Sequence, residues 1–144
     1  MSEQSLVTIL VNSEVCFPWK TSHAIAYLTE VKVTTNRVDV VYFEKKSGLE
    51  IGFIAAVEAK LKDWRTALQQ AHRDKLFADR VYVALPEKFS APAVSNIDQF
   101  RRASVGLMIV GDSGVKMHYH PPRNNYRSQR HVSHVKSILS AVPQ

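Results

Sequence analysis

Two segments carry charged residues where buried strands are expected, and this conflict constrains the chain more than any other feature. Residues 37–41 (Arg-Val-Asp-Val-Val) and 56–60 (Ala-Val-Glu-Ala-Lys) are rich in small and β-branched residues, and a turn sequence at 45–48 separates them. An unpaired charge is expensive to remove from water. Asp39, Glu58 and Lys60 are therefore hard to explain as core residues.

These three charged residues are expected to meet if the two strands pair as a hairpin. Side chains alternate along a strand, so Glu58 and Lys60 share one face while Ala59 points away. Asp39, on the neighbouring strand, then comes beside Glu58. Two carboxylates with a lysine at their edge predict a site for a hard divalent cation such as Mg2+.

The pattern Asp39-x(18)-Glu58-x-Lys60 resembles the active-site signature of the PD-(D/E)xK, or restriction-endonuclease-like, nuclease superfamily. Downstream, a helix that carries Gln70 leads into a strand at 80–85, as in that superfamily. One departure is Val38, which stands where the signature has proline. The resemblance covers residues from about 5 to 119 and implies an α/β fold: a restriction-endonuclease-like core with a central mixed sheet flanked by helices, in the order α-β-β-β-α-β.

The resemblance also implies roles for the charged residues. Asp39, Glu58 and the backbone carbonyl of Ala59 would hold Mg2+ or Mn2+, the cofactor of a phosphodiester hydrolase. Lys60 would orient the attacking water or neutralise developing negative charge. Gln70 would reach the site or a phosphate, although an ordinary polar helix flank explains it equally well.

Other residues near this signature could also take part in the site. Glu30 is expected to face solvent at a strand flank rather than to support the metal. The superfamily often draws an acid from its first helix, and Glu3 or Glu14 could fill that place, but no motif surrounds them and a solvated surface acid is favoured for each. Arg73, one turn beyond Gln70, could meet a nucleic-acid backbone with it.

The expected elements follow from hydrophobic periodicity and turn residues. The apolar stripe of the helix that Asp63 caps is formed by Trp64, Ala67, Leu68 and Ala71. We expect one nuclease-like domain over 1–122, with a basic C-terminal helix or tail at 123–144 that packs on it or extends it. The expected helices lie at 5–14, from 63 to 77, within 90–102 and at 128–141, and the expected strands lie at 24–33, 37–43, 51–60, 80–85, 105–110 and 115–119.

Positive charge is concentrated at the C-terminal end. Residues 1–112 are nearly neutral, with 14 Lys and Arg against 13 Asp and Glu, whereas 113–144 hold five basic residues and no acid. This distribution favours a polyanionic partner, DNA more than RNA, although surface solubility is the plainer explanation. Arg123, Arg127 and Arg130 are the predicted nucleic-acid contacts.

Other chemistries are disfavoured. Cys16 is the only cysteine, so no disulfide within the chain is expected and a reducing, cytoplasmic location is the default. The apolar run 6–11 is too short for a membrane span. The histidines do not form a recognisable tetrahedral zinc set, and phosphate-loop and dinucleotide-binding motifs are absent. These histidines are His118, His120, His131 and His134.

The sequence therefore predicts a Mg2+-dependent nuclease, an enzyme acting on DNA. The alternative is a catalytically silent nuclease-fold subunit that binds nucleic acid or a protein partner, and a soluble regulator with a fortuitous motif is a third reading. A 144-residue chain offers little surface for sequence readout, which favours a homodimer or a larger complex.

Overall fold

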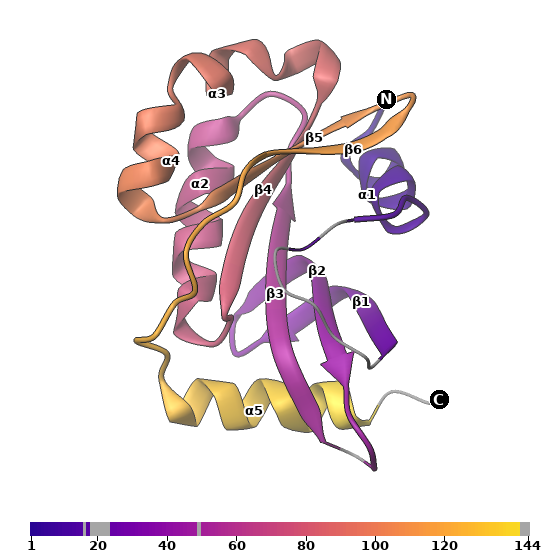
Figure 1. The fold of residues 1–144 in the computed structure, drawn as a ribbon, viewed down its shortest axis with the longest axis vertical. Helices are drawn as coiled ribbons and strands as arrows, with labels where there is room; N and C mark the ends of the chain where they lie inside the picture. The colour runs from indigo at the N-terminus through magenta and orange to yellow at the C-terminus, as the bar shows by residue number, and fades with distance from the viewer. Residues whose placement is uncertain (16, 18–23, 49, 142–144) are drawn as a thin grey trace.

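A six-stranded mixed sheet runs through the molecule, with helices on both of its faces (Figure 1). In this computed structural model, residues 1–15, 17, 24–48 and 50–141 are described. The elements are, in chain order, α1 (Glu3–Val11), β1 (Ala24–Val33), β2 (Asn36–Lys45), β3 (Ile51–Ala59), α2 (Trp64–Arg73), the 3-10 turn η1 (Asp74–Leu76), β4 (Arg80–Pro86), the 3-10 turn η2 (Glu87–Phe89), α3 (Ala91–Ser95), α4 (Ile97–Ala103), β5 (Gly106–Gly111), β6 (Gly114–Tyr119) and α5 (Gln129–Ser140).

The strands lie side by side in the order of the sequence, from β1 to β6. Antiparallel hairpins join β1 to β2, β2 to β3 and β5 to β6, whereas β3, β4 and β5 are parallel and need crossovers. Helices α2 to α4 make those crossovers. The predicted α/β class, with a central mixed sheet flanked by helices, is confirmed.

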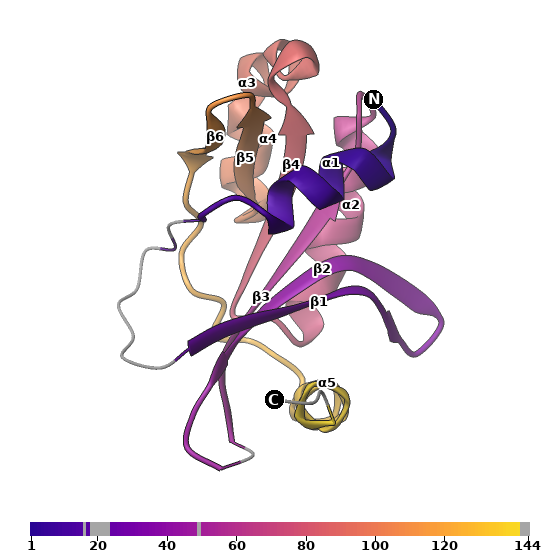
Figure 2. The ribbon, with the colours of Figure 1, turned by 90° about the vertical axis from the view of Figure 1, so that its right-hand side faces the viewer.

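One face of the sheet is covered by α2, α4 and α5 (Figure 2). Asp63 caps α2 as predicted, because its Oδ1 accepts the Thr66 backbone N–H at 3.1 Å. The stripe predicted for α2 is confirmed at Trp64, Ala67 and Ala71, which are buried, while Leu68 lies at its half-buried margin. Helix α2 is thereby fixed against β3 and β4.

The opposite face is covered by α1, whose Leu6 and Leu10 are fully buried. This helix begins two residues earlier than predicted because Ser2 caps it, accepting the Ser5 backbone N–H at 3.0 Å. It ends at Val11, short of the predicted limit at 14. The earlier start places Glu3 in the first turn of α1.

The helix expected within 90–102 is instead two short helices, α3 and α4, separated at Asn96. The Asn96 side chain donates to the Pro92 carbonyl at 2.7 Å, and its backbone leaves helical geometry (φ −112°, ψ 27°). A short amide side chain that bonds to the backbone competes with helix propagation. The helical character expected within 90–102 is confirmed, but the break at Asn96 was not predicted.

The C-terminal segment returns to the core rather than leaving it. Buried Val132, Val135 and Leu139 of α5 pack in the same cluster as the α2 stripe. The chain before α5 is held by backbone bonds: the N–H of Asn124 donates to the Asp79 carbonyl at 2.7 Å. The basic C-terminal helix is therefore packed on the same sheet as the rest of the chain.

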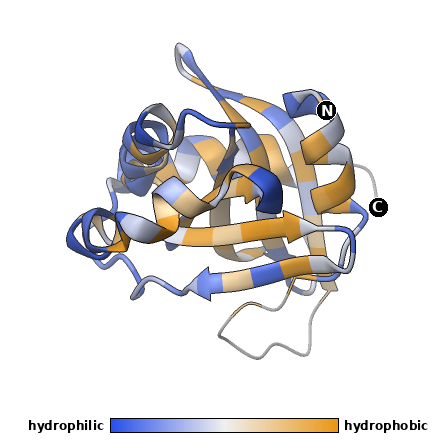
Figure 3. Cartoon of the chain, turned by 90° about the horizontal axis from the view of Figure 1, so that it is seen from above, coloured by the Kyte–Doolittle hydropathy of each residue, from blue (hydrophilic) through white to orange (hydrophobic). Residues whose placement is uncertain are grey.

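Hydrophobic residues are concentrated along the strands, as Figure 3 shows from above. Within the described ranges, no helix is long and apolar enough to cross a membrane. Trp64 is buried as predicted. Cys16 and Trp19 lie outside the described residues.

Candidate active site

The antiparallel register of β2 and β3 brings Asp39 to the end of β3. Val40 pairs with Val57, and one step further along the ladder the Ala59 backbone N–H donates to Asp39 Oδ2 at 2.8 Å. Buried Val38 and Val40 flank Asp39 on β2 and fix that strand in the core. The Asp39 carboxylate is thus held in place by the backbone of Ala59.

A cavity of about 360 Å³ opens at this end of the sheet. The predicted residues Asp39, Glu58, Lys60, Gln70 and Arg73 all line it, although they come from β2, from β3 and its end, and from α2. The remaining lining residues are Glu3, Thr35, Asn36 and Arg37. The structure therefore gathers the residues that the sequence pattern singled out.

Glu58 is the most buried charged residue of this cavity, with 1% of its surface exposed. Its Oε2 accepts no hydrogen bond from any described residue. Arg73 Nη2 lies 3.7 Å from that oxygen and 3.6 Å from Asp74 Oδ1. One half-exposed guanidinium is thus shared between two buried carboxyl groups.

Burial raises the pKa of Glu58 far above its ordinary value, and the neighbouring carboxyl groups of Asp74 and Asp39 raise it further. Arg73 acts in the opposite direction but is outweighed. Burial also raises the pKa of Asp74, although contacts with Glu58 and Arg73 pull it back. Without a bound cation, the Glu58 carboxyl group is therefore neutral at pH 7.

Asp74 was missed by sequence reasoning. It follows directly on the last residue of α2, where a negative charge meets the negative end of the helix dipole. That unfavourable position was a signal that Asp74 has a specific role, but the sequence does not reveal that its side chain turns inward toward Glu58.

Lys60 lies on the rim of the cavity. Its backbone N–H donates to the Ala84 carbonyl at 3.2 Å, and its Nζ is 3.8 Å from Glu3 Oε1 on α1. Glu3 was favoured as a solvated surface acid, yet it also lines the cavity, with half of its side chain exposed. The first helix thus contributes a carboxylate to the site, whereas exposed Glu14 does not line it.

Glu30 lies in an adjoining cavity of about 450 Å³ that shares Glu3, Arg37 and Asp39 with the first. Its side chain is 70% exposed, and its Oε1 is 3.8 Å from Arg37 Nη1. This is the solvent-facing position favoured for Glu30, outside the cavity that holds Glu58.

The C-terminal arginines lie elsewhere. Arg123 Nε is 3.2 Å from Asp79 Oδ1, and Arg127 Nη1 is 3.4 Å from Asp79 Oδ2. Arg130 is exposed on α5. None of the three lines the cavity of Glu58.

The donor chemistry of the site suits a hard cation, because carboxylate and carbonyl oxygens are the preferred ligands of Mg2+. The buried Glu58 Oε2 accepts no hydrogen bond from the described residues, and such an ion would be a partner for it. As the described side chains stand, no three His, Cys, Asp or Glu residues form a ready metal cage. Two carboxylates with the Ala59 backbone would leave most of a Mg2+ shell to water and substrate, as this ion prefers.

The site thus combines a buried acid, a half-buried lysine and a polar helix flank at one end of the sheet. No protein-family model matches the sequence, and no curated protein matches it.

Proposed function

We propose that this protein is a Mg2+-dependent nuclease with a restriction-endonuclease-like core, which hydrolyses phosphodiester bonds in DNA. One observation carries the proposal: Asp39, Glu58, Lys60 and Gln70 line a single cavity in which a buried Glu58 oxygen accepts no hydrogen bond from the described residues. A buried unsatisfied oxygen costs stability. Such a cost is expected where a ligand completes the site.

Asp39, Glu58 and the Ala59 carbonyl would hold the Mg2+ ion. When bound, the ion would make a water molecule more nucleophilic at neutral pH. Asp39 is suited to this position because the Ala59 N–H fixes one of its oxygens. Glu58 must give up its proton to bind a cation, so metal binding and deprotonation of Glu58 are coupled.

Lys60 would neutralise the negative charge that develops on the phosphate during hydrolysis. Its exposed fraction of 24% leaves the ammonium group accessible from the cavity. The contact with Glu3 at 3.8 Å holds it loosely, so a phosphate can replace that partner. Charge stabilisation of this kind contributes most when it acts in the transition state.

Gln70 and Arg73 would position the nucleic-acid backbone. Both lie on the cavity side of α2 and are half-buried, one turn apart. An amide and a guanidinium are common donors to phosphate oxygens, and such contacts fix orientation without reading sequence. Arg73 has a second role here, because it also balances the buried carboxyl groups of Glu58 and Asp74.

Nicking of supercoiled plasmid by the purified protein tests this function. We expect nicking with Mg2+ or Mn2+, none with EDTA, and a loss of at least about 10²-fold in Glu58→Gln, which removes the charge but keeps the shape. Glu14→Gln changes an exposed acid outside the cavity and is the matched control.

The alternative is a catalytically silent subunit that uses the same fold for binding. The raised pKa of Glu58 favours this alternative, because a carboxyl group that stays neutral is a poor ligand for a cation. DNA binding by the wild type without nicking, under conditions in which Mn2+ binding is detected, would establish the silent subunit and refute the nuclease.

A further inference from the structure

A second cavity, of about 400 Å³, lies at the other end of β3. Gly52 and Phe53 line it near the start of the strand, whereas Glu58 lies six residues beyond Gly52. At a rise of about 3.3 Å per residue, the two sites are roughly 20 Å apart along the strand. The cavity is therefore distinct from the candidate active site.

Basic side chains from four parts of the chain meet at this cavity. Lys46 follows β2, Arg80 begins β4, Arg123 and Arg127 precede α5, and Lys136 lies on α5. These five basic residues face three acids, Glu44, Glu50 and Asp79. The lining therefore carries more positive than negative charge.

Asp79 does not offer its charge to the cavity, because it is already satisfied. Only 2% of its surface is exposed. Its Oδ2 accepts the Ile54 backbone N–H at 2.8 Å and lies 3.4 Å from Arg127 Nη1, and its Oδ1 accepts from Arg123 Nε at 3.2 Å. Asp79 therefore holds the guanidinium groups of both arginines at the cavity.

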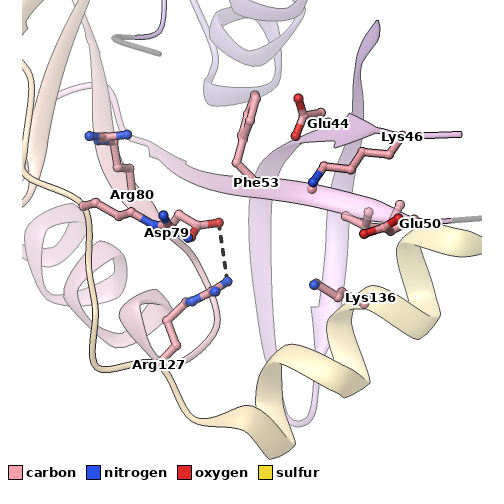
Figure 4. Close-up of a pocket in the computed structure, with 11 residues that line it drawn as sticks. Glu44, Lys46, Glu50, Phe53, Asp79, Arg80, Arg127 and Lys136 are labelled. Atoms are coloured by element: carbon pink, nitrogen blue, oxygen red, sulfur yellow. Dashed lines mark hydrogen bonds and ion pairs between the residues drawn. The ribbon is translucent and has the colours of Figure 1, made fainter. Parts of the chain in front are cut away.

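Two lysines complete the positive lining without a carboxylate partner. Lys46 and Lys136 are half-buried, and neither forms an ion pair with any described residue. In Figure 4 the ends of Lys46, Lys136 and Arg127 point toward one another across the cavity. Like charges that converge on one space repel each other unless an anion lies between them.

We propose that this cavity binds a phosphate group, held by the ammonium groups of Lys46 and Lys136 and the guanidinium of Arg127. Lysine acts as a point charge toward phosphate, and arginine adds directed N–H donors. The volume is large enough for a phosphate with part of the molecule that carries it. The phosphate belongs either to a small phosphorylated molecule or to a nucleic-acid backbone, and the site does not depend on the nuclease proposal.

The test compares two double variants that lose the same charge. Lys46→Gln with Lys136→Gln removes the unpaired cations and leaves the Asp79 contacts intact, so the fold is expected to persist. Lys32→Gln with Lys116→Gln changes two exposed lysines outside the cavity and is the matched control. Melting temperatures of both variants check that each is folded.

Calorimetry in metal-free buffer measures binding of pyrophosphate and, separately, of a short DNA duplex. We expect the cavity variant, but not the control, to bind one of them at least about 10-fold more weakly. A loss for pyrophosphate identifies a small phosphorylated ligand. A loss for the duplex alone, with a salt slope reduced by about 0.9 for each phosphate contact, identifies a nucleic-acid backbone.

Two results would overturn the site: no binding of either probe by the wild type, or equal losses in the cavity variant and the control. Glu58→Gln, tested beside them, is expected to leave pyrophosphate binding unchanged. Inactivity in the nicking assay therefore does not count against this cavity, and loss of the cavity does not count against the nuclease.

Discussion

Replacing Glu58 by glutamine is expected to stabilise the protein while it abolishes the proposed activity. The Glu58 side chain is only 2% exposed and lies against the carboxyl group of Asp74. Glutamine has the shape of the protonated acid and can donate a hydrogen bond to Asp74 as the protonated acid does. It never ionises, so it carries no proton-linked cost.

The sign and size of the effect follow from proton linkage. Burial raises the folded-state pKa of Glu58 to about 11 from an ordinary value of 4.5, so above pH 4.5 the folded protein keeps a proton that the unfolded chain loses. Stability is therefore lost as pH rises, by up to about 1.4 kcal/mol per pH unit. At pH 7 this amounts to about 3 kcal/mol at most.

Urea unfolding of the wild type and Glu58→Gln in EDTA, at several values from about pH 5 to about pH 9, measures this directly. The variant should be more stable, and its advantage should grow with pH. Glu14→Gln, an exposed change, should follow the wild type. An advantage that does not grow with pH, or a less stable variant throughout, would mean that Glu58 is ionised in the folded protein and that the reasoning from burial fails.

Three further predictions concern separate residues. Lys60→Met should lower metal-dependent nicking by about 10²-fold or more while melting is unchanged, because its exposed ion pair adds little stability; nicking at the wild-type rate would exclude Lys60 from catalysis. Arg127→Ala should cost about 2 kcal/mol in urea unfolding, since buried Asp79 loses a partner, whereas Arg130→Ala should cost almost nothing; equal effects would contradict that role. Asp39→Asn should weaken Mn2+ binding in calorimetry, and identical titration curves would remove Asp39 from the site.

Most strands were predictable because their signal is local. Runs of β-branched and aromatic residues bounded by turn residues gave β1 its full extent, Ala24–Val33, and placed the others within about two residues. Helix ends were less predictable. The start of α1 depends on the Ser2 cap, and the break between α3 and α4 depends on one side-chain bond from Asn96. Such competition between side chain and backbone is decided by tertiary context.

The candidate site was predictable where a pattern linked residues that are distant in the sequence. Strand alternation together with an expected hairpin was enough to bring Asp39 beside Glu58, and the observed register agrees with this. The partners of the buried charges were not predictable, because pairing depends on which side chains packing turns inward. Arg127, for example, lies against Asp79, whose burial no local pattern indicates.

The buried carboxyl groups near the two ends of β3 have different surroundings, and the difference bears on function. Asp79 has a partner for each oxygen: a backbone N–H with one arginine, and a second arginine. Glu58 is as deeply buried, but its Oε2 accepts no hydrogen bond from the described residues and a second acid lies beside it. A carboxyl group that served only the fold would be expected to resemble Asp79, because each unsatisfied buried group costs about 1 to 3 kcal/mol. The incomplete environment of Glu58 is therefore the stronger indication that an ion or substrate completes this end of the sheet, whereas the Asp79 contacts fix the C-terminal segment to the sheet.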